Sequence, residues 1–489
     1  MSQILIVMLY VLWVAAAPQR LPRGTAVDLE RLAVFLGGFA LLVAIPAVAA
    51  RVMTRRIRPH RVWPFARQFH YLTEAVKLAI TAWFAIGVFA TPTWIATVGV
   101  ILGRAGDAPL TLPAMLLGPL PSVLAWLGLW WAQYPVERLA REQSLLPMLE
   151  SDLPIHAPPT LLQFFSNNLR MQVLTTAVPL LMIAALRDVG ALTLLATGWA
   201  DPRGPWTGTL LSFGSALAVL LVAPEPLRHI LRTERLPPSS LRWRLDAVCR
   251  ATGTRYRDVL LWNTGYGMGN AAVMGVLPRI RYVLLSDLLL ESMTDRQIEA
   301  VFAHELGHVV HRHTVWFVLL IVTLALVMTA ASVALDGLLA QADLAQWLSG
   351  SAGWVAGVAM VAAAALSFGF VSRRFERQAD VFAARTMQSL VSPETAGATD
   401  PRRAAVGPEG AEMIASALAR AAVINNVPLE ARSFRHGSIA RRIRYIRQLA
   451  RTPERTFAFD RSMAFLYAGI LTALSLGVLS LWWLESVGR

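Results

Sequence analysis

The chain has 489 residues, which is long enough for more than one domain. Hydrophobic residues make up 55% of it and charged residues only 16%, whereas an average soluble protein has about 25% charged residues. The net charge is +14, but the arginines gather at the ends of apolar segments, and no basic stripe interleaved with aromatic residues is present. This composition excludes an ordinary soluble protein and predicts a membrane protein that does not bind nucleic acid.

Apolar segments of spanning length recur along the whole chain. A membrane helix needs roughly 20 apolar residues to cross the hydrocarbon core. The chain contains nine candidates, at 2–17, 31–50, 76–102, 112–132, 173–196, 207–224, 314–336, 351–371 and 463–484. The first has the length of a signal peptide, but no basic residue precedes its apolar core, which favours a retained helix. The fourth contains three prolines and is expected to be kinked or partly re-entrant.

Arginines in the loops predict how these spans are oriented, because cytoplasmic loops carry an excess of Lys and Arg. The densest cluster follows the second span and consists of Arg51, Arg55, Arg56, Arg58, Arg61 and Arg67. Alternation then places the polar segments 133–172, 228–313 and 372–462 on the same side. We therefore expect a protein of the bacterial inner membrane, with its N-terminus and its polar segments in the cytoplasm and its C-terminus outside.

The polar segment 228–313 is predicted to form a small α+β unit. An amphipathic helix over 239–252 is expected to end at Gly253. Three segments rich in β-forming residues follow, at 256–262, 270–277 and 280–285. A second helix is expected to begin at Thr294, because Gln297 completes a capping box with it. This helix is predicted to continue to about His313 and then to pass into the seventh span.

The second helix contains the pattern that carries the chemistry, since residues 300–313 read AVFAHELGHVVHRH. His304 and His308 are four residues apart, so a helix places both on one face, where they can bind one zinc ion. Zinc lowers the pKa of a bound water to about 7, and Glu305 is predicted to be the general base for that water. The alternative is a chance match, against which the apolar flanks, Gly307 and the capped helix start all count.

A catalytic zinc site usually has three protein ligands and one open position. Cys249 is the only cysteine, so the third ligand must be His, Asp or Glu. The longer pattern HExxHxxGxxH is excluded, because His311 and Thr314 stand where it requires glycine and histidine. His311 itself is a weak candidate for the third ligand.

Glu376 is the better candidate for the third ligand. It lies directly after the eighth span in the segment SRRFERQADVF, residues 372–382. Asp380 is four residues further on and shares its helix face. We expect Asp380 to support the site by accepting a hydrogen bond from a ligand histidine or by pairing with an arginine. The alternative is a solvated helix end in which local arginines neutralise both carboxylates, but the HExxH motif on the same side of the membrane favours the ligand.

His436 is the only histidine after the HExxH cluster. Taken alone, its basic and membrane-proximal surroundings favour a surface histidine. The other interpretation is an imidazole that stabilises the oxyanion of a tetrahedral intermediate.

Together these residues resemble the integral-membrane zinc metallopeptidases that include the CAAX prenyl protease and the bacterial HtpX-like heat-shock protease, which are glutamate-liganded zincins. Three blocks carry the likeness: residues 269–313, FERQAD at 375–380 and RHGSIARRI at 435–443. They cover roughly the segment 240–450, and no motif matches the first six spans. The resemblance implies that Glu305 is the base and that the zinc ligands are His304, His308 and Glu376.

The resemblance also implies roles outside the ligand set. His436 becomes an oxyanion-stabilising or substrate-contacting residue, and Arg442 is expected to pair with Asp380. The strand that begins near Asn270 is expected to be a sheet edge that binds extended substrate by strand addition. Asn270 and Ala271 are therefore predicted to contact the substrate.

The predicted fold is mainly α, with about nine membrane helices and a small cytoplasmic α+β unit of the zincin type. Three regions are expected: an N-terminal transmembrane region over 1–227, a zinc metallopeptidase domain over 228–462 that includes the spans 314–336 and 351–371, and a C-terminal transmembrane helix over 463–489.

The predicted function is that of a membrane-embedded endopeptidase with one Zn²⁺ per chain. Its partners are the bilayer and a protein or peptide substrate bound as an extended strand. A catalytically silent binding or chaperone-like factor with structural zinc is the alternative. A transporter is disfavoured because the spans contain few ionisable residues.

Overall fold

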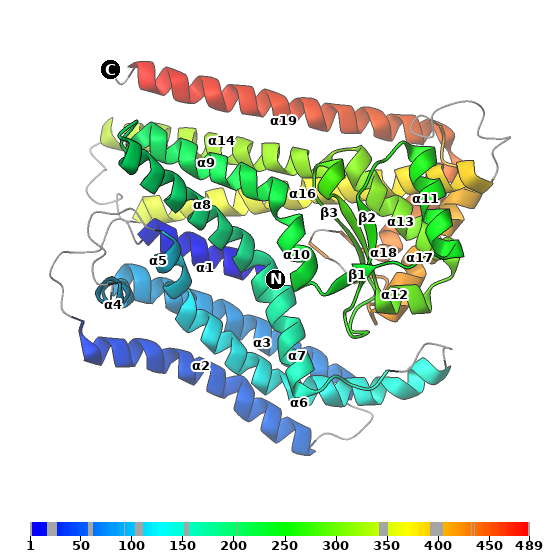
Figure 1. Ribbon diagram of the computed structural model, residues 1–489, viewed down its shortest axis with the longest axis horizontal. Helices are drawn as coiled ribbons and strands as arrows, with labels where there is room; N and C mark the ends of the chain where they lie inside the picture. Colours follow the sequence, from blue (N-terminus) through cyan, green and yellow to red (C-terminus); the bar gives the residue numbers. More distant parts are fainter. Residues whose placement is uncertain are drawn as a thin grey trace. The chain divides into compact units, whose positions relative to one another are not determined.

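The computed structural model describes residues 2–16, 27–56, 62–91, 93–102, 111–150, 156–202, 204–341, 351–391, 404–431, 433–434 and 436–487 (Figure 1). The chain divides into two compact units. The N-terminal unit comprises Met1–Thr233 and Asn263–Gly265, and the C-terminal unit comprises Glu234–Trp262 and Tyr266–Arg489. The predicted fold class is confirmed, because nearly all regular structure is helical and the strands form one small sheet.

Apart from Thr233, where β1 (Thr233–Arg235) begins, the described part of the N-terminal unit is built from helices. They are α1 (Ser2–Ala16), α2 (Leu29–Arg56), α3 (Val62–Ala85), η3 (Ile86–Ala90), α4 (Thr93–Ile101), α5 (Leu112–Leu117), α6 (Leu120–Glu150), α7 (Leu161–Asn168), η4 (Leu169–Leu174), α8 (Thr175–Thr197), α9 (Pro205–Val222) and α10 (Pro224–Ile230). Large side chains from α3 and α6, among them Phe84, Trp126 and Trp130, fill its core. The helix of the predicted fourth span is interrupted at Gly118 and Pro119, where α5 ends and α6 begins, and the two helices together form one candidate span.

Two buried charges of the N-terminal unit, Lys77 and Asp188, have partners in the same unit. Lys77 on α3 pairs with Glu74 one turn earlier, with 2.7 Å between Nζ and Oε1. Asp188 on α8 accepts hydrogen bonds from the backbone N–H groups of Thr111 and Leu112 at 2.8 and 2.7 Å. That carboxylate therefore satisfies N–H groups at the start of α5, which have no partner within the helix.

The C-terminal unit combines a four-stranded sheet with helices. After β1 (Thr233–Arg235) come α11 (Ser240–Thr252), β2 (Asp258–Trp262), β3 (Ala271–Met274), η5 (Pro278–Ile280), β4 (Tyr282–Ser286), α12 (Asp287–Ser292), α13 (Asp295–Val310), α14 (His313–Gln341), α16 (Ser351–Val391), α17 (Pro408–Ile424), α18 (Ile439–Arg451) and α19 (Pro453–Val487). The strand order is β1-β2-β4-β3, with β4 parallel to β2 and antiparallel to β3. The predicted α+β unit, with its first helix and three strands, is confirmed.

Helices α13 and α16 pack closely, and this packing positions the candidate site. The predicted capping box at Thr294 and Gln297 is present at the start of α13. Phe302 and Leu306 are fully buried on one face of α13. A Cβ atom at Gly307 would lie 2.9 Å from the Cα of Ala379 on α16, so only glycine allows this approach. Close packing therefore brings the HExxH segment against the segment FERQAD.

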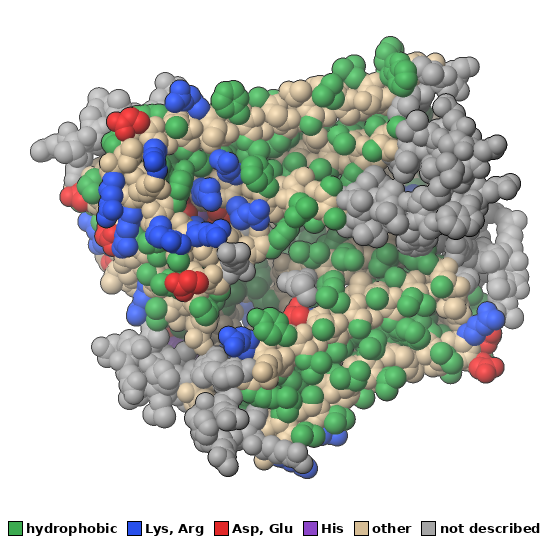
Figure 2. Space-filling view, turned by 180° about the vertical axis from the view of Figure 1, so that it is seen from behind, with side chains coloured by type: hydrophobic (Ala, Val, Ile, Leu, Met, Phe, Trp, Pro, Cys, Tyr) green, Lys and Arg blue, Asp and Glu red, His purple; other side chains and the backbone are tan. Residues whose placement is uncertain are grey.

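The number of spanning helices differs from the prediction. Within the described residues, six helices are long and apolar enough to cross a membrane, or seven if α9 and α10, which meet at a bend of 57°, form one span. The first predicted span forms the 15-residue helix α1, which is short for a crossing. The eighth lies in α16, where the side chains up to residue 361 are outside the described set. In the C-terminal unit, hydrophobic side chains follow the long helices, and Arg side chains gather at one end (Figure 2).

One further prediction is wrong. The helix that begins at Thr294 does not pass continuously into the seventh span, because α13 ends at Val310 and α14 begins at His313. Between them Arg312 has a φ of 54°, in the left-handed region that non-glycine residues rarely adopt. The capping signal gave the helix start, but no glycine or proline marks this break.

Candidate metal centre

Three side chains from α13 and α16 converge on one point. One ligand atom each from His304, His308 and Glu376 lies within 4.8 Å of the other two. The two Nε2 atoms are 3.3 Å apart. The Glu376 carboxylate lies 3.7 Å from Nε2 of His304 and 3.8 Å from Nε2 of His308. The structure thus brings together the three residues that the sequence proposes as ligands.

This arrangement fits a zinc ion. A tetrahedral centre with bonds of about 2.0–2.1 Å to nitrogen and oxygen keeps its ligand atoms roughly 3.3 Å apart, close to the spacing found here. Two imidazoles and one carboxylate are also an established donor set for catalytic zinc. His311, the weaker candidate, is outside the cluster: its ring stacks at 5.8 Å on that of His313.

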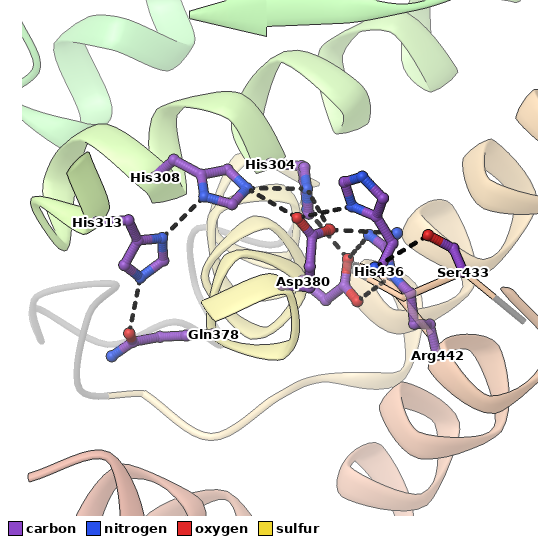
Figure 3. A network of polar contacts seen from close by, with 9 residues as sticks. His304, His308, His313, Gln378, Asp380, Ser433, His436 and Arg442 are labelled. Atoms are coloured by element: carbon purple, nitrogen blue, oxygen red, sulfur yellow. Dashed lines mark hydrogen bonds and ion pairs between the residues drawn. The ribbon is translucent and has the colours of Figure 1, made fainter. Parts of the chain in front are cut away.

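Asp380 lies at Nδ1 of His304, whereas Nε2 of the same ring faces the other ligands, and Arg442 pairs with Asp380. Oδ1 of Asp380 lies 3.0 Å from Nδ1 of His304. Arg442 on α18 donates to both carboxylate oxygens of Asp380, through Nε at 2.8 Å and an NH2 nitrogen at 2.7 Å (Figure 3). Its other terminal nitrogen lies 3.4 Å from Glu376. Asp380 thus lies against a candidate ligand histidine and pairs with an arginine, and its role in orienting His304 stays a prediction.

Before a cation binds, these contacts favour a protonated His304 and a neutral His308. Burial lowers the pKa of His304, but hydrogen bonds to Asp380 and Glu376 outweigh it and raise the pKa to about 10. Burial and the positive charge of His304 lower the pKa of His308 to about 3. Burial raises the pKa of Glu376 and of Asp380, but nearby positive groups outweigh it. His304, His436 and Arg442 hold the pKa of Glu376 well below its usual range. Arg442 and His304 lower the pKa of Asp380.

Glu305 lies beside the ligand cluster. Removal from water is the largest effect on its carboxyl group, and the nearby Glu376 adds to it, so the pKa of Glu305 rises to about 7. A hydrogen bond from the backbone of Val273 on β3 acts in the opposite direction. The carboxyl group therefore faces the ligand cluster on one side and the sheet edge on the other.

His436 also reaches the centre, from the segment between α17 and α18. Its Nδ1 lies 2.9 Å from Oε1 of Glu376, while about half of its side chain is exposed. A bridge between Ser433 and Gly437, together with the φ of 75° at Gly437, turns the backbone so that the ring points inward. Its second ring nitrogen is therefore available to a molecule bound at the site.

Strand β3 is the edge of the sheet next to this centre. The N–H of Ser286 donates to the carbonyl of Asn270 at 2.9 Å, so the backbone of Asn270 is used inside the sheet. Because backbone groups alternate along an antiparallel pair, Ala271 and Val273 direct theirs to the open edge. The backbone of Gly269, two residues before Ala271, is not open to a substrate. The side chain of Asn425 forms hydrogen bonds with both its N–H and its carbonyl, at 3.0 and 2.7 Å.

Sequence reasoning missed Val273 and Asn425 at this edge. The direction of the Val273 backbone depends on the register of β3 against β4, which β-propensity does not give. Asn425 is 156 residues away from Gly269 and lies at the end of α17. No local pattern marks it, although an asparagine just after a helix is a common turn residue.

Comparison with known proteins agrees with this geometry. Residues 247–447 match the model of peptidase family M48. The chain carries an M48 peptidase domain. The M48 domain contains every residue of the cluster described above, and M48 peptidases are zinc-dependent metallopeptidases. Helices long and apolar enough to cross a membrane accompany this match, as the sequence blocks predict.

Among solved structures, the crystal structure of S. mikatae Ste24p is similar at 13% sequence identity and a TM-score of 0.46, over 90% of this chain and 98% of that one. No curated protein matches the chain at a significant level.

Proposed function

We propose that the protein is a zinc-dependent endopeptidase that cleaves membrane or membrane-associated proteins. The observation that carries this proposal is the convergence of His304, His308 and Glu376 beside Glu305 and an open strand edge. When bound, zinc supplies Lewis-acid polarisation of the scissile carbonyl and makes the attacking water more acidic. The protein must then hold the substrate, accept a proton and stabilise negative charge.

The residues around the centre are suited to these three tasks. An extended substrate pairs with the outward backbone groups of Ala271 and with the carbonyl of Val273, whose N–H donates to Glu305. This pairing gives main-chain recognition with little sequence preference. Glu305 accepts a proton from the attacking water and delivers it to the leaving nitrogen. In its protonated form His436 donates one N–H to Glu376 and has the other for the developing oxyanion.

The decisive experiment compares the purified parent protein with Glu305→Gln in detergent, using zinc content and cleavage of an unfolded protein substrate. We expect one zinc per chain in both and a loss of cleavage in the variant of roughly 10²–10⁴-fold, the usual contribution of a general base. Glu454→Gln, an exposed carboxylate in the first turn of α19, is the matched control and should cleave like the parent. Equal cleavage by Glu305→Gln would overturn the mechanism.

The open edge of β3 also fits a second function, that of a zinc-containing factor which holds extended chains without cleaving them. In that case the parent binds unfolded protein without turnover, and Glu305→Gln binds equally well. The position of Glu305 against both the ligands and the edge favours the peptidase.

We also propose that the site faces the cytoplasm of a bacterial cell. The arginines at the end of the C-terminal unit support this orientation (Figure 2). Green fluorescent protein fused to the C-terminus should then stay dark, since that terminus would lie outside. A bright fusion would reverse the orientation.

A further inference from the structure

The second ligand histidine has a support of its own, built from uncharged residues. Nδ1 of His313 lies 2.8 Å from Nδ1 of His308. Nε2 of His313 lies 2.9 Å from Oε1 of Gln378 on α16 (Figure 3). The hydroxyl of Tyr467 on α19 donates to the same oxygen at 2.6 Å. His313 is almost completely buried, and its ring stacks on Phe375 with centroids 4.2 Å apart.

The break between α13 and α14 makes this contact possible. In a continuous helix a residue five positions after His308 is rotated by about 140° from it and cannot meet it on the same face. The left-handed backbone of Arg312 interrupts the helix and returns His313 to the side of His308. An uncommon conformation at a non-glycine residue is thus retained where it places one imidazole against another.

The hydrogen positions along this series of hydrogen bonds follow from the contact between Tyr467 and Gln378. Oε1 of Gln378 is an acceptor and already receives the Tyr467 hydroxyl, so Nε2 of His313 must donate to it. Nδ1 of a neutral His313 is then an acceptor and takes the Nδ1–H of His308. That leaves the lone pair of His308 on Nε2, which faces His304 and Glu376. The opposite orientation of the Gln378 amide would put a hydrogen on Nε2 of His308 and block a metal bond.

We propose that His313 is a positioning residue for the metal centre: with Gln378 and Tyr467 it fixes the tautomer of His308 that leaves Nε2 free to bind zinc. This inference rests on the zinc site of the proposed function. It adds a requirement that the HExxH pattern does not contain, because the tautomer is set by a residue beyond the end of the helix.

The test measures zinc affinity by competition with a chelator at pH 7, independently of cleavage. His313→Phe keeps the ring stacked on Phe375 but removes the acceptor, and we expect its zinc Kd to rise roughly 10–100-fold, as for other residues behind a metal ligand. His313→Gln supplies a carbonyl acceptor and should recover most of the affinity. His311→Phe is the matched control, since its ring lies beside His313 outside the ligand cluster, and should bind like the parent.

A second pair of variants keeps the test decisive if His313→Phe does not fold. Tyr467→Phe removes the donor that fixes the Gln378 amide, and Gln378→Leu removes the amide. Each should raise the zinc Kd severalfold while the thermal midpoint in detergent stays close to that of the parent. The proposal is overturned if folded His313→Phe, or both of the second variants, bind zinc within threefold of the parent. A parent that binds no zinc refutes the proposed function instead, so the two failures are distinguishable.

Discussion

The two ligand histidines of one helix are held in different ways. His304 is supported by charge, through Asp380 and the bidentate Arg442. His308 is supported by neutral groups, through His313, Gln378 and Tyr467. A charged support is strong, but removing one partner destabilises the protein greatly, because the other charge stays buried without a counter-charge. A neutral support contributes less energy and mainly selects a tautomer.

Removal of Arg442 should have the largest effect, because it leaves the carboxylates of Asp380 and Glu376 without their cation in a buried site. We expect Arg442→Ala to destabilise the protein by about 3–5 kcal/mol, the usual cost of breaking a buried pair. Thermal unfolding in detergent measures this.

The matched control for this change is Arg447→Ala on the same helix. Arg447 pairs with Glu412 at 2.7 Å, but both side chains are about half exposed or more, so its removal should cost about 0–1 kcal/mol. If both variants unfold at the same temperature, charge is not what holds the His304 side of the site.

The charged support of His304 could be predicted largely from the sequence, whereas the neutral support of His308 could not. The spacing of His304, His308, Glu376 and Asp380 is local to two helices, so the i,i+4 rule predicted which faces they share. The partner of Asp380 came from a resemblance to known sequences rather than from local pattern. The neutral support was not predicted, because it depends on the break at Arg312 and on a contact with α19 that no periodicity encodes. Within the described residues fewer helices reach spanning length than the nine expected, because α1 is short and the eighth segment lies partly outside the described side chains.

The pH dependence of the zinc-free protein should separate the two supports. His304 has a raised pKa of about 10, so its contribution to stability is complete below the unfolded value of about 6.5 and is lost as pH rises towards 10. His308 has a lowered pKa of about 3, so stability falls as pH drops below 6.5, where the unfolded chain takes up a proton that the native ring does not. The pKa of Glu305, raised to about 7, opposes the acid limb above about pH 4.5, where the native carboxyl binds a proton that the unfolded one does not. Unfolding in EDTA should therefore show a broad maximum that ends near pH 6.5.

Single substitutions assign the two limbs of this profile. Asp380→Asn should flatten the alkaline limb, because it removes the charge that raises the pKa of His304. His308→Asn should flatten part of the acid limb. The depressed pKa values of Glu376 and Asp380 add a further loss below about pH 4, as both acids take up protons more readily when unfolded. A profile that both variants leave unchanged would mean that these histidines do not set it.

Asn425→Ala should have the smallest effect and should act on neither support. The variant loses the two hydrogen bonds to Gly269, at about 1 kcal/mol each, and opens one more rung of the substrate edge next to Ala271. We expect unchanged zinc affinity and unchanged cleavage of short peptides, with KM lowered severalfold only for peptides long enough to reach Gly269. Asn426→Gly at its exposed neighbour, whose φ of 52° glycine adopts without strain, is the control. If peptide length makes no difference, extended substrate does not pair along β3. A change in zinc affinity would instead show that the edge and the His308 support are coupled.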